Sequence, residues 1–137
     1  MRRTFLIQAI LLGIFLSPIA VGSEPPVLGQ WEGESICTVK DSPCHDEHVI
    51  YRVTQDSKQP EKLAIAAYKV VKGEELYMGD IDCRFVAEAS ELRCHYKPTD
   101  SWIFKLSGDT MKGTLTINGN TLYRNVSVKR VALTPVK

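Results

Sequence analysis

Apolar and polar residues alternate along much of this chain with a period of two. The segments VIYRV (49–53), WIFKL (102–106) and MKGTLTI (111–117) each place their first, third and fifth residues on one face, and these are apolar except for Gly113. Successive side chains of a β-strand point to opposite faces, whereas an amphipathic helix repeats about every 3.6 residues. The pattern therefore predicts strands with one buried face, and no segment after residue 22 has a convincing helical period.

Turn residues divide the chain into short segments of this kind. The clearest hairpin surrounds Asn118 and Gly119, because both tolerate the positive φ angles of a tight turn. The pattern predicts eight strands, at 28–38, 49–54, 63–71, 76–85, 91–96, 101–106, 110–117 and 121–131. Strands with one buried face and short connections form an antiparallel meander, which hides its edges best by closing. We therefore predict an all-β fold, an eight-stranded antiparallel up-and-down barrel over residues 28–133.

The first 22 residues differ from the rest of the chain. Two arginines precede an apolar stretch (5–15), and small residues follow up to Gly22. This order is typical of a secretory signal peptide cleaved after Gly22, and Gln8 and Pro18 interrupt the long apolar run that a membrane anchor needs. The run RRTFLIQ also resembles a twin-arginine signal, so both export routes stay open. We expect export to the periplasm or the cell exterior, without membrane insertion once the signal is removed.

The mature chain predicted in this way holds a single domain. It begins with an extended leader (23–27), in which Pro25 and Pro26 prevent a helix, and ends with a tail (134–137). The whole chain has 17 basic and 16 acidic residues; removal of residues 1–22 takes away two arginines and leaves 15 and 16, a net charge of −1. So balanced a charge gives no electrostatic signal for nucleic acid or for an anionic membrane surface.

Four cysteines in an exported chain indicate two disulfides rather than a metal site. Cys37 and Cys44 flank a turn-forming loop that contains Pro43. Cys83 and Cys94 flank RFVAEASELR, whose antiparallel pairing would bring them face to face. Of the three possible connectivities, we predict Cys37 with Cys44 and Cys83 with Cys94.

The stretch CTVKDSPCHDEHV (37–49) also offers two histidines and three carboxylates. At the start of a strand, however, His45 and His48 would not converge, and a zinc site normally needs three or four ligands. The remaining histidine, His95, is far along the chain. We therefore predict a polar hairpin mouth held by a disulfide, and no metal or other cofactor.

The first predicted strand opens with LGQWEGES, in which Gly29 and Trp31 form a Gly-x-Trp motif. This motif resembles the opening of the lipocalins and their calycin relatives. In that family the tryptophan plugs the closed end of the barrel and an arginine from the last strand lies across it, which implies a structural role for Arg130. The stretches SPCHDEHVIYRV and MKGTLTINGNTLYR also resemble small exported bacterial barrel proteins of unassigned activity.

Catalytic motifs are missing from the sequence. It contains no Gly-x-Ser-x-Gly, no phosphate-binding glycine loop, and no free cysteine once two disulfides form. Asp80 and Asp82 share one face of a strand, but they alternate with apolar residues and small ones, which predicts that they face solvent. We therefore expect a protein that is not an enzyme.

Arg124 is the residue that most suggests a bound molecule. Its parity matches that of Leu122, Val126 and Val128, so a barrel with this face inside places a guanidinium in the interior. A buried arginine needs an internal partner, such as a glutamate or tyrosine, or else an anionic ligand. The candidate ligand-binding residues are Arg124 and three aromatic residues predicted to face inward, Tyr51, Trp102 and Phe104.

Two functions remain open from the sequence. The first is an exported, noncatalytic barrel that binds a small, partly apolar molecule that is anionic if Arg124 anchors it. The second is a protein-binding module, such as an inhibitor of a periplasmic or secreted hydrolase, that uses the loops DSKQPEK (56–62) and KPTDSW (97–102). An internal cavity of a few hundred Å³ would favour the first, and a filled barrel with an exposed aromatic loop would favour the second.

Overall fold

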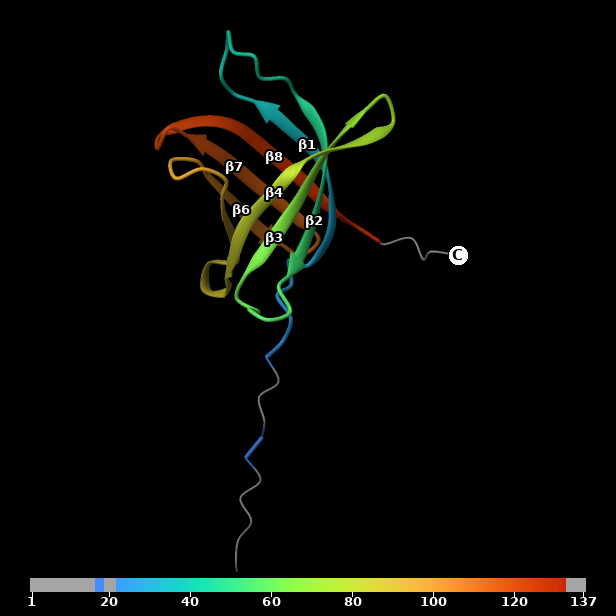
Figure 1. The fold of residues 1–137 in the computed structure, drawn as a ribbon, viewed down its shortest axis with the longest axis vertical. Coiled ribbons are helices and arrows are strands. Elements are labelled where there is room, and N and C mark those ends of the chain that lie inside the picture. Colours follow the sequence, from blue (N-terminus) through green and yellow to red (C-terminus); the bar gives the residue numbers. More distant parts are fainter. Residues whose placement is uncertain (1–16, 19–21, 133–137) are drawn as a thin grey trace, which may run out of the picture.

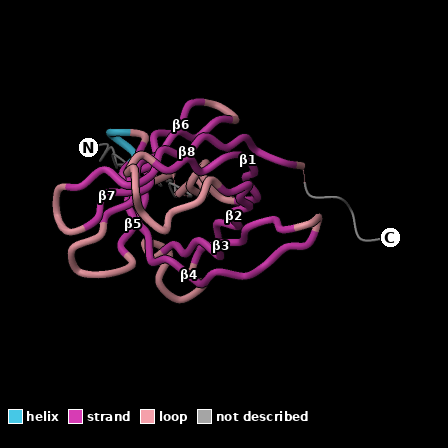
Figure 2. The backbone as a smooth tube through the Cα atoms, turned by 90° about the horizontal axis from the view of Figure 1, so that it is seen from above, coloured by secondary structure: helices cyan, strands magenta, loops and turns pink. Residues whose placement is uncertain are grey.

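The computed structural model describes residues 17–18 and 22–132, and these form a closed barrel of eight antiparallel strands. Each strand pairs with its neighbours in sequence, and the last pairs with the first, as Figures 1 and 2 show. The strands are β1 (Gly29–Cys37), β2 (Glu47–Gln55), β3 (Leu63–Val71), β4 (Glu74–Val86), β5 (Glu91–His95), β6 (Ser101–Ser107), β7 (Thr110–Ile117) and β8 (Thr121–Val131), and a short helical turn, η1 (Ala87–Ala89), joins β4 to β5.

This architecture confirms the predicted fold class. Predicted and observed strands differ by at most two residues at either end, because the alternation that predicts a strand weakens where the chain enters a turn. The buried face of the barrel carries the alternating apolar residues, among them Val49, Tyr51, Phe104 and Met111. Most of the predicted signal peptide and the tail (134–137) lie outside the described residues.

One position departs from the predicted alternation. The register between β7 and β8 shifts between Leu115 and Thr116, so that Leu115 pairs with Arg124 whereas Thr116 pairs with Leu122. This bulge turns Leu122 to the outside, where its side chain is 44% exposed. The prediction that Leu122 shares the inward face of Arg124 is therefore wrong, while Val126 and Val128 are buried as predicted.

One end of the barrel is closed around Trp31, which is fully buried. Its indole Nε1 donates a hydrogen bond to the Val27 carbonyl (2.8 Å), and Val27 is itself fully buried beside it. The guanidinium carbon of Arg130 lies 4.3 Å from the centre of the indole ring. Arg130 Nη1 also donates to the Leu28 carbonyl (2.7 Å), which ties the start of the domain to the last strand.

The backbone conformation explains why the Gly-x-Trp motif begins with a glycine. Gly29 has a φ of +120°, a backbone conformation that residues with a side chain rarely adopt. A Cβ atom added there would lie 3.3 Å from Arg130 Nη1. A glycine at this position therefore lets the chain turn into the barrel while Arg130 approaches the indole.

Both predicted disulfides are present. Cys37 and Cys44 close the loop that follows β1, and Cys83 and Cys94 join directly opposed positions of β4 and β5. The second pair is buried in the barrel interior. All four cysteines of the chain are thus oxidised, as the spacing predicts.

Loss of the Arg130 side chain should weaken the closed end. We expect Arg130→Ala to lower the free energy of unfolding by about 1 to 3 kcal/mol, through lost stacking on Trp31 and lost packing. Urea denaturation measures the change. Lys129→Ala, on the exposed face of the same strand, is the control and should change stability by less than about 0.5 kcal/mol.

Addition of a methyl group at Gly113 should also weaken the barrel. A Cβ at this position would lie 2.4 Å from Phe104 Cδ1, and Phe104 is fully buried. We therefore expect Gly113→Ala to destabilise the barrel by about 1 to 3 kcal/mol through overpacking. Thr114→Ala, at the exposed neighbouring position, is the matched control. Equal effects of the two substitutions in thermal unfolding would contradict this packing.

Candidate functional site

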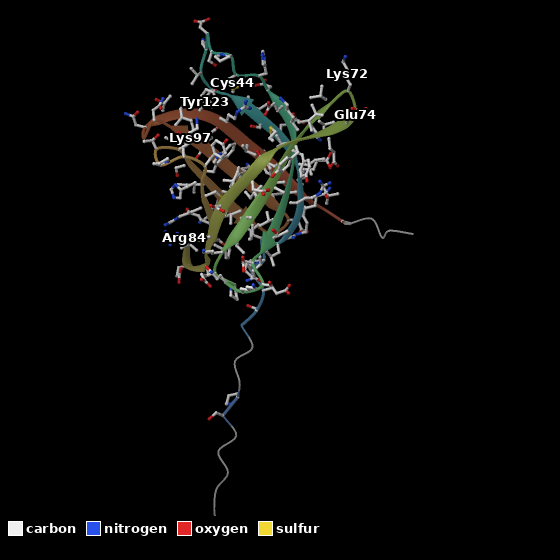
Figure 3. All side chains as sticks on the ribbon, in the orientation of Figure 1. Cys44, Lys72, Glu74, Arg84, Lys97 and Tyr123 are labelled. Carbon is white, nitrogen blue, oxygen red and sulfur yellow. A yellow bond between two sulfur atoms is a disulfide. The ribbon has the colours of Figure 1, made fainter. Side chains whose placement is uncertain are left out.

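A cavity of about 270 Å³ lies toward the end of the barrel opposite Trp31. Figure 3 places the labelled residues Cys44, Tyr123 and Lys97 around this open end and Arg84 at the opposite end. Nine of the twelve lining residues lie on the strands β2, β3, β4, β6, β7 and β8, and the other three on β1 and the β5–β6 loop. The lining residues are Ser35, Glu47, Tyr51, Ala67, Met78, Gly79, Ile81, Tyr96, Asp100, Trp102, Leu115 and Arg124.

One wall of the cavity is aromatic. The rings of Tyr51 and Trp102 meet edge to face, with centres 6.4 Å apart, and Trp102 stacks on Phe104 at 5.7 Å. Phe104 is fully buried and lies outside the cavity lining, so it supports Trp102 from below. Of the three aromatic residues selected from the sequence, the structure thus brings Tyr51 and Trp102 to the cavity and leaves Phe104 in the core.

The Tyr51 hydroxyl is neutral in this setting. Burial raises the pKa of Tyr51 far above its ordinary value, because the phenolate would lose its hydration. The positive charge of Arg124 acts in the opposite direction, but burial dominates. Tyr51 therefore offers a ligand an apolar ring and an uncharged hydroxyl.

Arg124 points into the cavity and is held by several partners. Its Nη1 donates to Ser35 Oγ (3.2 Å), to the Ser35 carbonyl (3.4 Å) and to the His45 carbonyl (3.1 Å). The same atom lies 3.6 Å from Glu47 Oε2. Glu47 is thus an internal carboxylate partner of the kind that the sequence left open, and it has the inward parity of Val49 and Tyr51 in β2.

The guanidinium retains unused donors. All its hydrogen bonds to the described residues use Nη1, and neither Nε nor Nη2 is a fully buried atom without a partner. These two groups therefore retain some solvent exposure, and Arg124 is one of the residues that line the cavity. A bound oxygen atom can accept from them without displacing Glu47, since the ion pair involves the other nitrogen.

The acidic residues of the site belong to two different settings. Glu47 lies between two cations, because Lys69 Nζ is 3.6 Å from its Oε1 while Arg124 approaches Oε2. Asp100, in the β5–β6 loop, accepts one long hydrogen bond from the Asn118 amide (3.4 Å) and has no ion pair with a described residue. The cavity therefore combines an apolar aromatic wall with one arginine and two carboxylates.

Sequence reasoning missed two residues of the rim, Tyr96 and Asp100. Asp100 lies in the loop between β5 and β6, where alternation gives no information on side-chain direction. Tyr96 stands at the end of the predicted strand 91–96 with the parity of Cys94, but it was not selected as a site residue. The loop itself was selected as a protein contact, but its contribution to the same cavity as Arg124 depends on the folded barrel. Met78 and Gly79 were also missed. Gly79 has the inward parity of Ile81 but no side chain that would suggest a site, whereas Met78 turns inward because β4 carries a bulge between its pairs Gly79–Ala67 and Tyr77–Tyr68.

The stretch from Cys37 to Val49 forms a turn whose polar groups bind one another. Asp46 accepts a hydrogen bond from the Cys37 amide (2.8 Å), beside the disulfide. His48 lies on the outer face between two glutamates, with Nε2 2.7 Å from Glu32 and Nδ1 2.6 Å from Glu34. Within the described part of the chain, no three metal-ligating side chains are close enough to hold an ion.

Comparison with protein-family models finds no matching family, and a search of curated proteins finds no matching relative. The closed eight-stranded antiparallel barrel is consistent with a calycin-like fold. Its two disulfides are typical of an oxidising, non-cytoplasmic environment. Over residues 17–18 and 22–132, none of the helical structure is long and apolar enough to cross a bilayer.

Stability should depend on pH through His48. The hydrogen bonds to Glu32 and then to Glu34 raise the pKa of His48, because both favour the imidazolium. A raised folded-state pKa stabilises the fold fully below the unfolded value, near 6.5, and the contribution is lost as pH rises through the folded value. His48 is 39% exposed, so we expect at most about 1 kcal/mol.

Urea denaturation at pH 5.5 and pH 8.5 measures this effect. His48→Gln should cost stability at the lower pH and much less at the higher one. In a Glu32→Gln/Glu34→Gln background the same substitution should lose most of its pH dependence, because the carboxylates that favour the imidazolium are gone. An identical cost at both pH values in the wild-type background would contradict the charged pair.

Proposed function

We propose that this protein is an exported, noncatalytic, calycin-like barrel that binds a small, partly apolar molecule in its open-end cavity. The observation that carries the proposal is one cavity of about 270 Å³ lined by Trp102, Tyr51 and Arg124 together. Small-molecule sites are typically concave and mostly apolar, with a few polar groups that orient the ligand. This cavity has both parts.

The free donors of Arg124 favour a ligand with an acceptor or acidic group. A carboxylate placed against Nε and Nη2 would receive two charge-assisted hydrogen bonds, the strongest pattern that arginine offers. Glu47 already balances part of the arginine charge, so the ligand's acidic group contributes selectivity more than raw affinity. Export is supported by the disulfides and by the predicted signal peptide.

The second candidate function is a protein-binding module, such as an inhibitor of a periplasmic or secreted hydrolase. Tyr96 favours it, since this residue is 60% exposed next to the loop at 97–102. An exposed aromatic ring on a loop is a common anchor of protein interfaces. The cavity beside Tyr96 favours the small-molecule function, which we therefore rank above the protein-binding function.

Three probes with the same apolar body and different charge test the first function. We expect 3-methylindole, indole-3-acetate and tryptamine to perturb the NMR signals of Tyr51 and Trp102 if they enter the cavity. Indole-3-acetate should bind most tightly. Arg124→Met should lower the affinity for indole-3-acetate by about fivefold or more and change the affinity for 3-methylindole by less than about twofold. Only the acid uses the guanidinium.

The same variant also separates binding from folding. Glu47 keeps Lys69 as a partner in Arg124→Met, so the free energy of unfolding should change by less than about 1 kcal/mol. The control is Arg93→Met, at an arginine that pairs with Glu91 on β5. It should leave the affinity for all three probes unchanged. Tighter binding of tryptamine than of indole-3-acetate would contradict the acidic preference. Failure of all three probes to perturb Tyr51 or Trp102 would contradict the cavity as the site.

A further inference from the structure

The strand β4 is much longer than its neighbour β5. It pairs with β3 from Glu74 to Cys83, but with β5 only from Asp82 to Val86. The edge of β4 from Glu74 to Ile81 therefore has no strand beside it. The nearby loop at 96–100 makes no backbone hydrogen bond to this edge among the described residues. Figures 1 and 2 show the β3–β4 hairpin reaching beyond the body of the barrel.

An unpaired edge of this length is a template for another strand. Its outward N–H and C=O groups can pair with an extended segment, which gains main-chain hydrogen bonds along its length. The added strand would lie between β4 and the loop that carries Tyr96 and Asp100. It would thereby cover the side of the barrel where Met78 and Gly79 line the cavity.

The charge of this edge restricts what can pair with it. The segment from Glu74 to Asp82 contains four acidic residues and no basic one. Glu75 is bound by Arg52 at 2.8 Å, whereas Glu74, Asp80 and Asp82 are exposed and have no ion pair with a described residue. A basic segment therefore finds unneutralised partners along the edge.

A second copy of the chain is a poor occupant. Antiparallel pairing of two β4 edges about their middle, with Glu75 of each copy opposite Asp80 of the other on the outer face, would bring like charges together twice. Like charges directly opposite each other destabilise a strand pair.

The two faces of the edge differ in chemistry. Tyr77, Asp80 and Asp82 pair with the outward residues Tyr68, Ala66 and Ala64 of β3, so they face outward. Met78 lines the cavity on the other face, and Leu76 pairs with Lys69, which reaches Glu47. An added strand would therefore meet acidic residues on its outer face and apolar residues on its inner face.

We propose that the free edge of β4, from Glu74 to Ile81, binds an extended segment of a partner protein in which basic and apolar residues alternate. A basic side chain lies opposite Asp80 and reaches diagonally toward Asp82, whose own opposite position is taken by His95 of β5. The apolar side chains lie against Leu76 and Met78. This interaction goes beyond the small-molecule function, since it needs no ligand in the cavity.

A synthetic peptide of seven residues, acetyl-Lys-Val-Lys-Val-Lys-Val-Lys-amide, is a direct probe. We expect it to shift the backbone NMR signals of residues 74–81 and to slow amide hydrogen exchange at alternate positions there. Two control peptides keep its length. Glu in place of each Lys should abolish binding through charge, and N-methylation of alternate amides should abolish it through lost main-chain hydrogen bonds while the charge stays.

Charge reversal on the protein is the complementary test. Asp80→Lys/Asp82→Lys should lower the affinity for the lysine peptide by about fivefold or more, since each exposed ion pair contributes a modest amount to the binding free energy. Glu61→Lys/Glu88→Lys gives the same change of net charge on exposed residues away from this edge, and should change the affinity by less than about twofold. Circular dichroism of both variants checks that the barrel is intact.

Three outcomes would overturn the proposal. Equal binding of the N-methylated peptide would mean that charge alone attracts it. Signal changes confined to regions outside β4 would place the peptide elsewhere. A concentration-dependent dimer with slowed exchange at residues 74–81 would make a second copy the occupant. The indole probes report on the cavity separately, so either proposal can fail while the other stands.

Discussion

The barrel depends on the eight residue pairs that join β1 to β8, from Gln30–Val131 to Cys37–Arg124. Without them the sheet would have two long free edges and two wet faces. The two backbones approach closely at Gly33. A Cβ atom added there would lie 2.0 Å from the Ser127 carbonyl oxygen. Only glycine allows this contact, so one small residue in the first strand permits the closure that gives the sheet an inside.

The same strand pair also determines both ends of the barrel. Trp31 pairs with Arg130, which places a guanidinium over the indole at the closed end. Six residues earlier in β8, Arg124 pairs with Cys37 and reaches the Ser35 hydroxyl at the open end. Two arginines on one face of one strand thus have different roles, because one packs on an aromatic ring and the other borders a cavity.

Much of this arrangement could be predicted from the sequence, because it follows from local patterns. Alternation gives the strands, and Gly29, Trp31 and Arg130 indicate the closed end. The environment of Arg124 was harder to predict, since its partner Glu47 is distant in the sequence and Asp100, which lines the same cavity, comes from a loop. Leu122 was misplaced because a bulge reverses the alternation, and no residue type marks that bulge.

The disulfide between Cys37 and Cys44 connects the oxidation of the chain to the shape of its cavity. The linked loop leads directly to His45, whose carbonyl accepts a hydrogen bond from Arg124. Covalent closure of the loop limits where that carbonyl can lie, and with it the direction of the guanidinium. The newly synthesised, reduced chain lacks this restraint. The cavity mouth therefore acquires its final form only once Cys37 and Cys44 are oxidised.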